Sequence, residues 1–281
     1  MSSPSDAASP DWLEACRRAV VGLREVFAEH PTSRERIVET GDTGEGGDLT
    51  LVIDSQAEDA VFAQLDALHA AGARFTAISE ERGVVEYGGG DVRVVIDPLD
   101  GSLNAKRGMT HFALSITVAD GPTMADVHFG FVYDFGPREE WYAHRDEGAW
   151  LNGRRIDAPP RERRTPDGRM EIVTFESADP RLLAPRIAAL GETVNRLRAM
   201  GSIAISLCQL AATRVDGMFT LRPTRSVDVA AAQLIVRETG AVVAFPGFDD
   251  PLGAPLDIEP HSRVVAARTP ESLAQLIAAL G

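Results

Sequence analysis

Two carboxylates stand close together at a turn in the first half of the chain. Asp97 and Asp100 are three residues apart in IDPLDGS (96–102), which ends a continuous apolar run. Two acids on a turn that carries proline and glycine can point to one place, and Mg²⁺ prefers a few carboxylate oxygens together with water and substrate phosphate. Asp-Pro and Asp-Gly are also common turn formers, so in isolation this segment fits a surface turn better.

Further acids stand where predicted strands end or predicted helices begin. Glu80 and Glu81 close an apolar run, and adjacent carboxylates repel each other unless solvent or a cation lies between them. Asp228 opens a predicted helix, where an aspartate can equally cap the backbone. Asp48 closes a glycine-rich stretch and Asp54 precedes a helix, so both also have ordinary explanations as turn or cap residues.

The elements that must position these acids are predicted from the pattern of apolar residues. A first helix is predicted by Ser9 as its cap, Pro10 at its first position, Asp11 in its first turn and apolar residues at helical spacing over residues 12–27. A glycine-rich loop over residues 41–48 then leads into an apolar strand over residues 49–53. A capping box formed by Ser55 and Glu58 predicts a second helix that ends at the next glycine.

The pattern changes along the rest of the chain. Short β-rich runs between residues 75 and 151 predict a largely antiparallel sheet, and the proline-rich, charged segment 157–168 is the candidate junction between two halves. Strands and helices then alternate, which is typical of layered α/β packing. The strands are expected near 171–175, 194–200, 217–221, 241–245 and 263–267, and the helices near 180–190, 202–214, 227–238 and 270–280.

The composition excludes several classes of protein. The chain has 281 residues, 44% of them hydrophobic, so it can bury a real core, and its formal charge is −14. An acidic protein lacks a general field for nucleic acid or an anionic membrane, so we expect neither partner. Cys16 and Cys208 predict buried thiols rather than a disulfide framework. With no basic, apolar leader and no run of roughly 18 apolar residues, we expect a cytoplasmic protein.

In their order and with their neighbours, these motifs resemble the inositol monophosphatase family, a magnesium-dependent, lithium-sensitive phosphatase superfamily that includes fructose-1,6-bisphosphatases. The resemblance runs from about Trp12 to the C-terminus. Its carriers are GDLTLVID (47–54), SEE (79–81), DPLDGSLN (97–104), GAWLNG (148–153), GSIAISLCQLA (201–211) and SVDVAAAQLIVRETG (226–240). It implies an α/β (α+β) fold, a layered α/β/α/β/α sandwich. The half 1–156 would carry the metal-binding motifs, and the half 157–281 would complete the site.

The resemblance also implies a magnesium site. Glu80, Asp97 and the carbonyl of Leu99 would bind a first Mg²⁺. Asp97, Asp100 and Asp228 would bind a second, so Asp97 would bridge the two ions. A third, weaker ion near Glu80 is a further family feature. Two such ions can activate water and stabilise the leaving oxygen of a phosphate ester.

Catalytic and substrate residues follow from the same resemblance. Ser102 stands where the family usually has threonine, and its hydroxyl, with Asp48, would orient the attacking water beside Glu80. The backbone N–H groups of Gly101 and Ser102 would hold phosphate oxygens. The substrate-binding residues would be Gly101, Ser102, Gly201, Ser202, Arg222, Arg225 and Asp228.

The substrate stays open at this point. The resemblance implies hydrolysis of a small polyol or sugar phosphate, with inositol-1-phosphate as the default and fructose-1,6-bisphosphate as the nearest alternative. Arg222 and Arg225 would suit a second phosphate, but they are equally explained as surface side chains of an arginine-rich chain. Other family substrates are 3′-phosphoadenosine 5′-phosphate, histidinol phosphate and NADP. An alternative of another class is a non-catalytic regulatory binding protein.

Several neighbouring residues allow two interpretations. Val227 replaces the tryptophan usual before the late aspartate, a departure that removes no metal ligand. Lys106, the only lysine, and Arg107 could reach the phosphate or a partner subunit, although a solvated loop face explains such a pair more often. His111 is expected to be structural, since histidine suits zinc better than magnesium. The family implies a homodimer.

Overall fold

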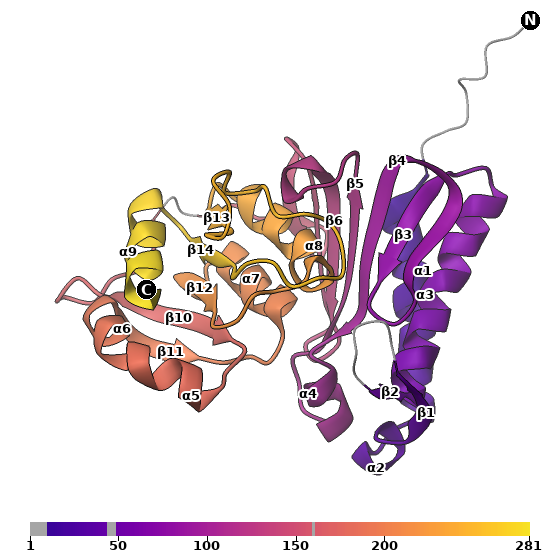
Figure 1. Ribbon diagram of the computed structural model, residues 1–281, viewed down its shortest axis with the longest axis horizontal. Coiled ribbons are helices and arrows are strands. Elements are labelled where there is room, and N and C mark those ends of the chain that lie inside the picture. Colours follow the sequence, from indigo (N-terminus) through magenta and orange to yellow (C-terminus); the bar gives the residue numbers. More distant parts are fainter. Residues whose placement is uncertain (1–9, 44–48, 159–160) are drawn as a thin grey trace, which may run out of the picture.

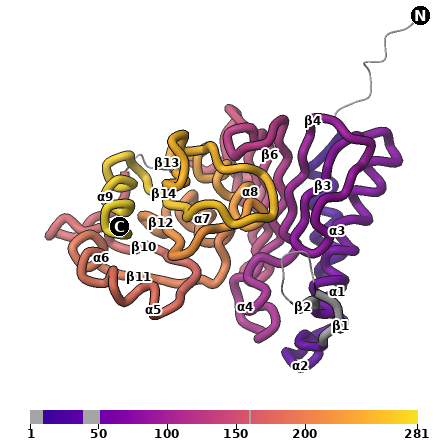
Figure 2. The backbone as a smooth tube through the Cα atoms, in the orientation of Figure 1, coloured from indigo at the N-terminus to yellow at the C-terminus, as the bar shows by residue number. Residues whose placement is uncertain are grey.

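The computed structural model describes residues 10–43, 49–158 and 161–281, and these form five layers (Figure 1). Helices α1 and α3 cover one face of a seven-stranded sheet, and α7 and α8 lie between this sheet and a five-stranded one. Helices α5, α6 and α9 cover the outer face of the second sheet. The predicted α/β/α/β/α sandwich is therefore confirmed. Figure 2 shows the same order, from indigo helices at one end to yellow α9 at the other.

The N-terminal helices pack on each other and on the first sheet. Helix α1 (Trp12–Glu29) is present, but it begins later than predicted: Asp11, expected in its first turn, is its cap and accepts a 3.0 Å hydrogen bond from Glu14 N. Its apolar face and that of α3 (Val52–Ala70) enclose a core of buried aliphatic and aromatic side chains. The short α2 (Ser33–Arg36) was not predicted.

The entry to α3 differs from the prediction. Strand β1 (Glu39–Thr43) pairs with β2 (Leu49–Leu51), so the predicted loop does not begin at residue 41 and the predicted strand over 49–53 ends at Leu51. The helix begins at Val52 because the side chain of Asp54, at its third position, accepts from Leu51 N at 3.3 Å. The predicted capping box at Ser55 and Glu58 is therefore wrong.

The first sheet has the order β3-β4-β5-β6-β7-β8-β9 and is antiparallel from β4 onward, as predicted. Two separate parts of β4 pair with β3, so Ala77 lies opposite both Val85 and Val94. The strands are β3 (Phe75–Ser79), β4 (Gly83–Asp100), β5 (Ala113–Ala119), β6 (Val127–Asp134), β7 (Glu139–His144), β8 (Gly148–Leu151) and β9 (Arg154–Arg155). Helix α4 (Ser102–Arg107) follows β4, and the 3-10 helix η1 (Met124–Asp126) precedes β6.

The second sheet is mixed and has the order β11-β10-β12-β14-β13. Its strands are β10 (Met170–Glu176), β11 (Val194–Arg198), β12 (Gly217–Thr220), β13 (Val242–Ala244) and β14 (Val265–Ala267). The outer helices are α5 (Pro180–Leu183), η2 (Ala184–Arg186), α6 (Ile187–Thr193) and α9 (Pro270–Leu280). The helix predicted over 180–190 is thus three short pieces, and the other predicted elements of this region are present. The boundary between halves at 156/157 stays a prediction.

The middle layer joins the two sheets. Helix α7 (Ile203–Ala211) is buried apart from its first residue, and α8 (Ser226–Arg237) is buried from Ser226 to Val236. Helix α8 lies so close to β6 that a Cβ on Gly130 would come within 2.5 Å of the Ala231 carbonyl oxygen, so only glycine fits there. Both cysteines are buried free thiols, as predicted. Among the described residues, no helix is long and apolar enough to cross a membrane.

Candidate metal and phosphate site

Three acids from separate elements meet where the first sheet faces the middle layer. Glu80 directly follows β3, Asp97 lies near the end of β4, and Asp228 is in the first turn of α8. Each offers a carboxylate oxygen, and these atoms all lie within 4.8 Å of one another. We call these three side chains the acidic cluster. The predicted convergence of residues 17 to 148 positions apart in sequence is therefore found in the fold.

Burial and mutual repulsion disfavour the charged forms of the carboxylates in the cluster. Asp97 is 3% exposed, and burial followed by the charges of Glu80, Asp100 and Asp228 raises its pKa well above the usual range. Burial also raises the pKa of Glu80. Asp97 Oδ1 accepts a 2.8 Å hydrogen bond from Leu99 N, which fixes the orientation of this carboxylate. A donor set of buried carboxylate oxygens fits a hard divalent cation such as Mg²⁺.

Asp100 connects the first sheet to the start of α7. Its Oδ2 accepts from Ser202 Oγ at 2.6 Å and from Ala204 N at 2.7 Å. Burial, together with the charge of Asp228, raises the pKa of Asp100 to about 7, although these hydrogen bonds act in the opposite direction. Asp100 thus lies beside the cluster with one carboxylate edge already bound by a helix N-terminus.

Arg225 provides the positive charge at the cluster. Its Nη1 lies 2.6 Å from Glu80 Oε1, and its Nη2 lies 3.0 Å from Asp228 Oδ1. Burial acts to lower the pKa of Arg225, but the two carboxylates raise it above the usual value. The residue predicted to bind substrate is therefore bound to two predicted metal ligands.

The turn after β4 is held in a tight backbone packing. Gly101 has φ of 88°, and a Cβ there would lie 2.8 Å from the His111 carbonyl oxygen and 3.0 Å from that of Gly201. Asn104 Nδ2 donates to the carbonyls of His111 and Met200, both at 2.8 Å. Ser102 begins α4 directly after this glycine. The predicted phosphate turn and the Gly-Ser turn before α7 therefore lie against each other.

Other predicted residues lie apart from the cluster or outside the described residues. Arg222 is exposed and pairs with Asp179 at 3.1 Å. Lys106 Nζ lies 3.3 Å from Asp54 Oδ2, a contact that the sequence did not reveal. Asp48 lies outside the described residues, so its predicted role stays a prediction.

His111, predicted to be structural, has φ of 67°, and its Nδ1 lies 3.8 Å from the buried carboxylate of Asp134. Arg107 lies in the last turn of α4, and its role stays open.

Two buried glutamates support the site and were missed by the sequence analysis. Glu176 accepts from Met200 N and Gly201 N, both at 2.9 Å, and from Ser206 Oγ, so it holds the turn before α7. Glu58 accepts from the hydroxyl of Ser79, the residue before Glu80. A signal for Glu58 existed: it falls at helical spacing on the same face as buried apolar residues of α3.

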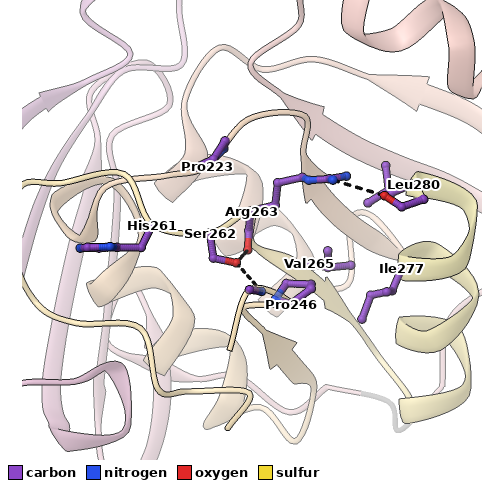
Figure 3. A pocket seen from close by; sticks show the side chains of 10 residues that line it. Pro223, Pro246, His261, Ser262, Arg263, Val265, Ile277 and Leu280 are labelled. Atoms are coloured by element: carbon purple, nitrogen blue, oxygen red, sulfur yellow. Dashed lines mark hydrogen bonds between the residues drawn. The ribbon is translucent and has the colours of Figure 1, made fainter. Parts of the chain in front are cut away.

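A hollow of about 420 Å³ near the C-terminus is separate from the acidic cluster (Figure 3). Apolar side chains of Val265, Ile277 and Leu280 line one part of it, and His261 lies at its other side. Arg263 donates to the Gly281 carbonyl at 3.3 Å. None of the predicted site residues lines this hollow, so it is not part of the candidate site.

The layered fold is of the sugar-phosphatase type, and comparison with known proteins gives the family. A profile of the inositol monophosphatase family matches residues 12–281. The fructose-1,6-bisphosphatase/inositol-1-monophosphatase of Thermococcus kodakarensis is 35% identical over 202 residues, 72% of this chain and 71% of that protein. The chain belongs to the inositol monophosphatase family, whose members are metal-dependent phosphatases.

Two further relatives carry a different name. The Nus factor SuhB of Pasteurella multocida is 34% identical over 199 residues, 70% of this chain and 71% of that protein. The crystal structure of extragenic suppressor protein suhB from Bartonella henselae matches with a TM-score of 0.75 and 24% identity, covering 95% of this chain and 97% of that one. The structural match establishes the shared fold.

Proposed function

We propose that the protein is a Mg²⁺-dependent phosphomonoesterase that hydrolyses a small polyol or sugar phosphate. The observation that carries this proposal is the acidic cluster, in which three largely buried carboxylates lie within 4.8 Å of one another. Glu80, Asp97 and the Leu99 carbonyl would hold one ion, and Asp97, Asp100 and Asp228 would hold the second. A weaker third ion would bind near Glu80. Family membership supports the same chemistry.

When bound, two Mg²⁺ ions polarise the phosphate and stabilise the charge that develops on the leaving oxygen. The chain supplies the positioning. The N–H groups of Gly101 and Ser102 hold phosphate oxygens, and the Ser102 hydroxyl, with Asp48, orients the attacking water beside Glu80. Ser202 fixes the orientation of the Asp100 carboxylate by donating a hydrogen bond to its Oδ2. Gly201, Ser202 and Asp228 bind the hydroxyls of the substrate.

Inositol-1-phosphate is the first proposed substrate and fructose-1,6-bisphosphate the second. A relative that carries both names supports this pair. Arg222 lies in the segment before α8, and its side chain is exposed. Its Nη2 donates to Asp179 Oδ2, and the rest of the guanidinium can bind a second phosphate. 3′-phosphoadenosine 5′-phosphate, histidinol phosphate and NADP complete the candidates.

A panel of these five esters tests the proposal. We expect phosphate release that requires Mg²⁺, with the largest kcat/KM for inositol-1-phosphate. Arg222→Ala should reduce kcat/KM for fructose-1,6-bisphosphate more than for inositol-1-phosphate. A full set of esters that stays intact with Mg²⁺ present would contradict the proposed function, and equal losses in Arg222→Ala would contradict only the role of that arginine.

A second candidate is a regulatory role without turnover, favoured by the relative named Nus factor SuhB. The net charge of −14 disfavours direct contact with nucleic acid, so a protein partner is the form of this role that the chain supports better. The ester panel separates the two candidates. For the assembly we propose a homodimer, which light scattering on the purified protein tests, and for the compartment we propose the cytoplasm.

A further inference from the structure

Arg225 occupies the position in which a cation is needed. Its guanidinium approaches the acidic cluster with three nitrogens: Nη1 at 2.6 Å from Glu80, Nη2 at 3.0 Å and Nε at 3.4 Å from the two oxygens of Asp228. About a quarter of the side chain is exposed. Within the described part of the chain, it is the only basic side chain within 4.0 Å of the carboxylates of Glu80, Asp97 and Asp228.

We propose that Arg225 is a built-in competitor of the metal. Its guanidinium neutralises the cluster when no ion is bound, and it has to leave Glu80 and Asp228 before these carboxylates can bind Mg²⁺. This inference rests on the proposed function, because it assumes that the cluster is a metal site. It adds a determinant of metal affinity that the ligand set does not contain.

The competition follows from the oxygens that both cations use. Glu80 Oε1 and Asp228 Oδ1 each accept a hydrogen bond from the guanidinium, and ligand bonds to an ion use lone pairs of the same carboxylates. A guanidinium and a divalent ion that contact the same carboxylates also repel each other, because both are positively charged. The two cations therefore exclude one another, and part of the free energy of metal binding is spent on breaking the contacts of Arg225.

The other basic residues near the site do not share this arrangement. Arg222 pairs with Asp179 and Lys106 pairs with Asp54, so their recorded ion pairs are with acids outside the cluster. Arg225 is also attached to α8 at the position just before the helix, where its own N–H bonds to Asp228 at 3.3 Å. The competing charge is therefore tethered to a ligand and acts at a high effective concentration.

The test compares metal binding by full-length, chelator-treated variants in calorimetric titrations with Mg²⁺ and Mn²⁺. Arg225→Gln should bind both ions at least about tenfold more tightly than the wild type, because the three hydrogen bonds of the guanidinium to Glu80 and Asp228 no longer have to break. Arg225→Lys, which keeps the charge but loses the forked geometry, should fall between them. Arg214→Gln is the matched control, since Arg214 makes bonds of 2.6 and 2.7 Å to Glu139 outside the cluster.

Thermal unfolding gives a second readout that does not depend on turnover. Without metal, Arg225→Gln should have a lower Tm than the wild type, since the cluster loses its neutralising charge. Saturating Mn²⁺ should raise the Tm of Arg225→Gln by more than it raises the Tm of the wild type. If either ion binds Arg225→Gln and Arg225→Lys no more tightly than it binds the wild type, the inference is overturned while the metal site stands. If no variant and no wild type binds either ion, the proposed function itself fails.

Discussion

Ser202 Oγ donates a 2.6 Å hydrogen bond to Asp100 Oδ2 across 102 positions of the chain. Asp100 ends β4 of the first sheet, and Ser202 caps α7 of the middle layer. The same serine accepts from Ile205 N at 3.1 Å, so one hydroxyl both starts the helix and fixes a proposed metal ligand. The candidate site is therefore a property of the contact between layers rather than of a local motif.

Ser202→Ala should lower the free energy of unfolding by about 1 kcal/mol, because α7 loses its cap. It should also weaken Mg²⁺ binding about tenfold, because Asp100 loses the hydroxyl that orients it. Denaturant titration and calorimetry measure the two effects. Thr269→Ala is the matched control: Thr269 caps α9 by accepting from Ser272 N at 3.2 Å, far along the chain from the cluster. Equal metal affinity in both variants would contradict the role of Ser202.

Asp97→Asn should have opposite effects on stability and function. Without metal, the variant should be more stable than the wild type near pH 7.5, because it removes a buried charge among other carboxylates while Oδ1 can still accept from Leu99 N. With Mg²⁺, the variant should show little further stabilisation and should lose more than about 100-fold in turnover. Mutation of a residue that only hydrogen-bonds to a metal ligand already reduces metal affinity or activity about 10- to 100-fold. Near-normal turnover would be incompatible with a bridging role for Asp97.

The stability of the metal-free protein should fall between about pH 4.5 and pH 7, in part because of Glu58. Burial raises the pKa of this glutamate from 4.5 to about 7, so the folded state binds the proton more tightly than the unfolded state. The corresponding stability is fully present below pH 4.5 and is lost as the pH rises through about 7. Its size is on the order of 3 kcal/mol.

Glu58→Gln should therefore flatten the pH dependence of the free energy of unfolding over this range. Asp59→Asn is a matched control, because Asp59 is the next residue, is exposed and pairs with the same Arg82 as Glu58. Denaturant titrations at several pH values in the presence of chelator give the slopes. Parallel curves for wild type and Glu58→Gln would show that Glu58 does not titrate in this range.

Gly101→Ala should destabilise the protein more than Gly108→Ala does. Both glycines have positive φ, 88° and 68°, so both substitutions carry the strain of a left-handed residue, about 1 kcal/mol. A Cβ at Gly101 would also meet two carbonyl oxygens, whereas none of the atoms near Gly108 lies within 4 Å of such a Cβ. Thermal unfolding compares the two. Equal losses would mean that the turn can shift without cost.

The sequence predicts most of this fold because its signals are local. The apolar spacing of α1, the alternating elements after residue 170 and the antiparallel sheet are all confirmed, whereas α1 is capped by Asp11 and not by the predicted Ser9. The predicted start of α3 was wrong because the sequence contains two overlapping capping patterns there. The helix uses the pattern of Leu51 and Asp54 instead of that of Ser55 and Glu58. Glu58 was assigned to a cap, although its side chain bonds to Ser79 on a neighbouring strand.

The site is predicted only as far as residue type and order allow. Glu80, Asp97 and Asp228 are identified by their motifs, and the fold brings them together. The sequence does not predict that Arg225 binds two of them, or that Glu176 holds the turn before α7. Both contacts join segments far apart in the chain, and their geometry depends on how the layers pack.

Phosphate release by the metal-depleted protein, before and after Mg²⁺ is restored, tests the central claim most directly. We predict that the chelator-treated wild type releases no phosphate from inositol-1-phosphate or fructose-1,6-bisphosphate, that added Mg²⁺ restores release, and that Asp97→Asn stays inactive at every Mg²⁺ concentration. Release that persists in chelator, or that is equal in wild type and Asp97→Asn, would contradict the claim that the acidic cluster holds the metal for this chemistry.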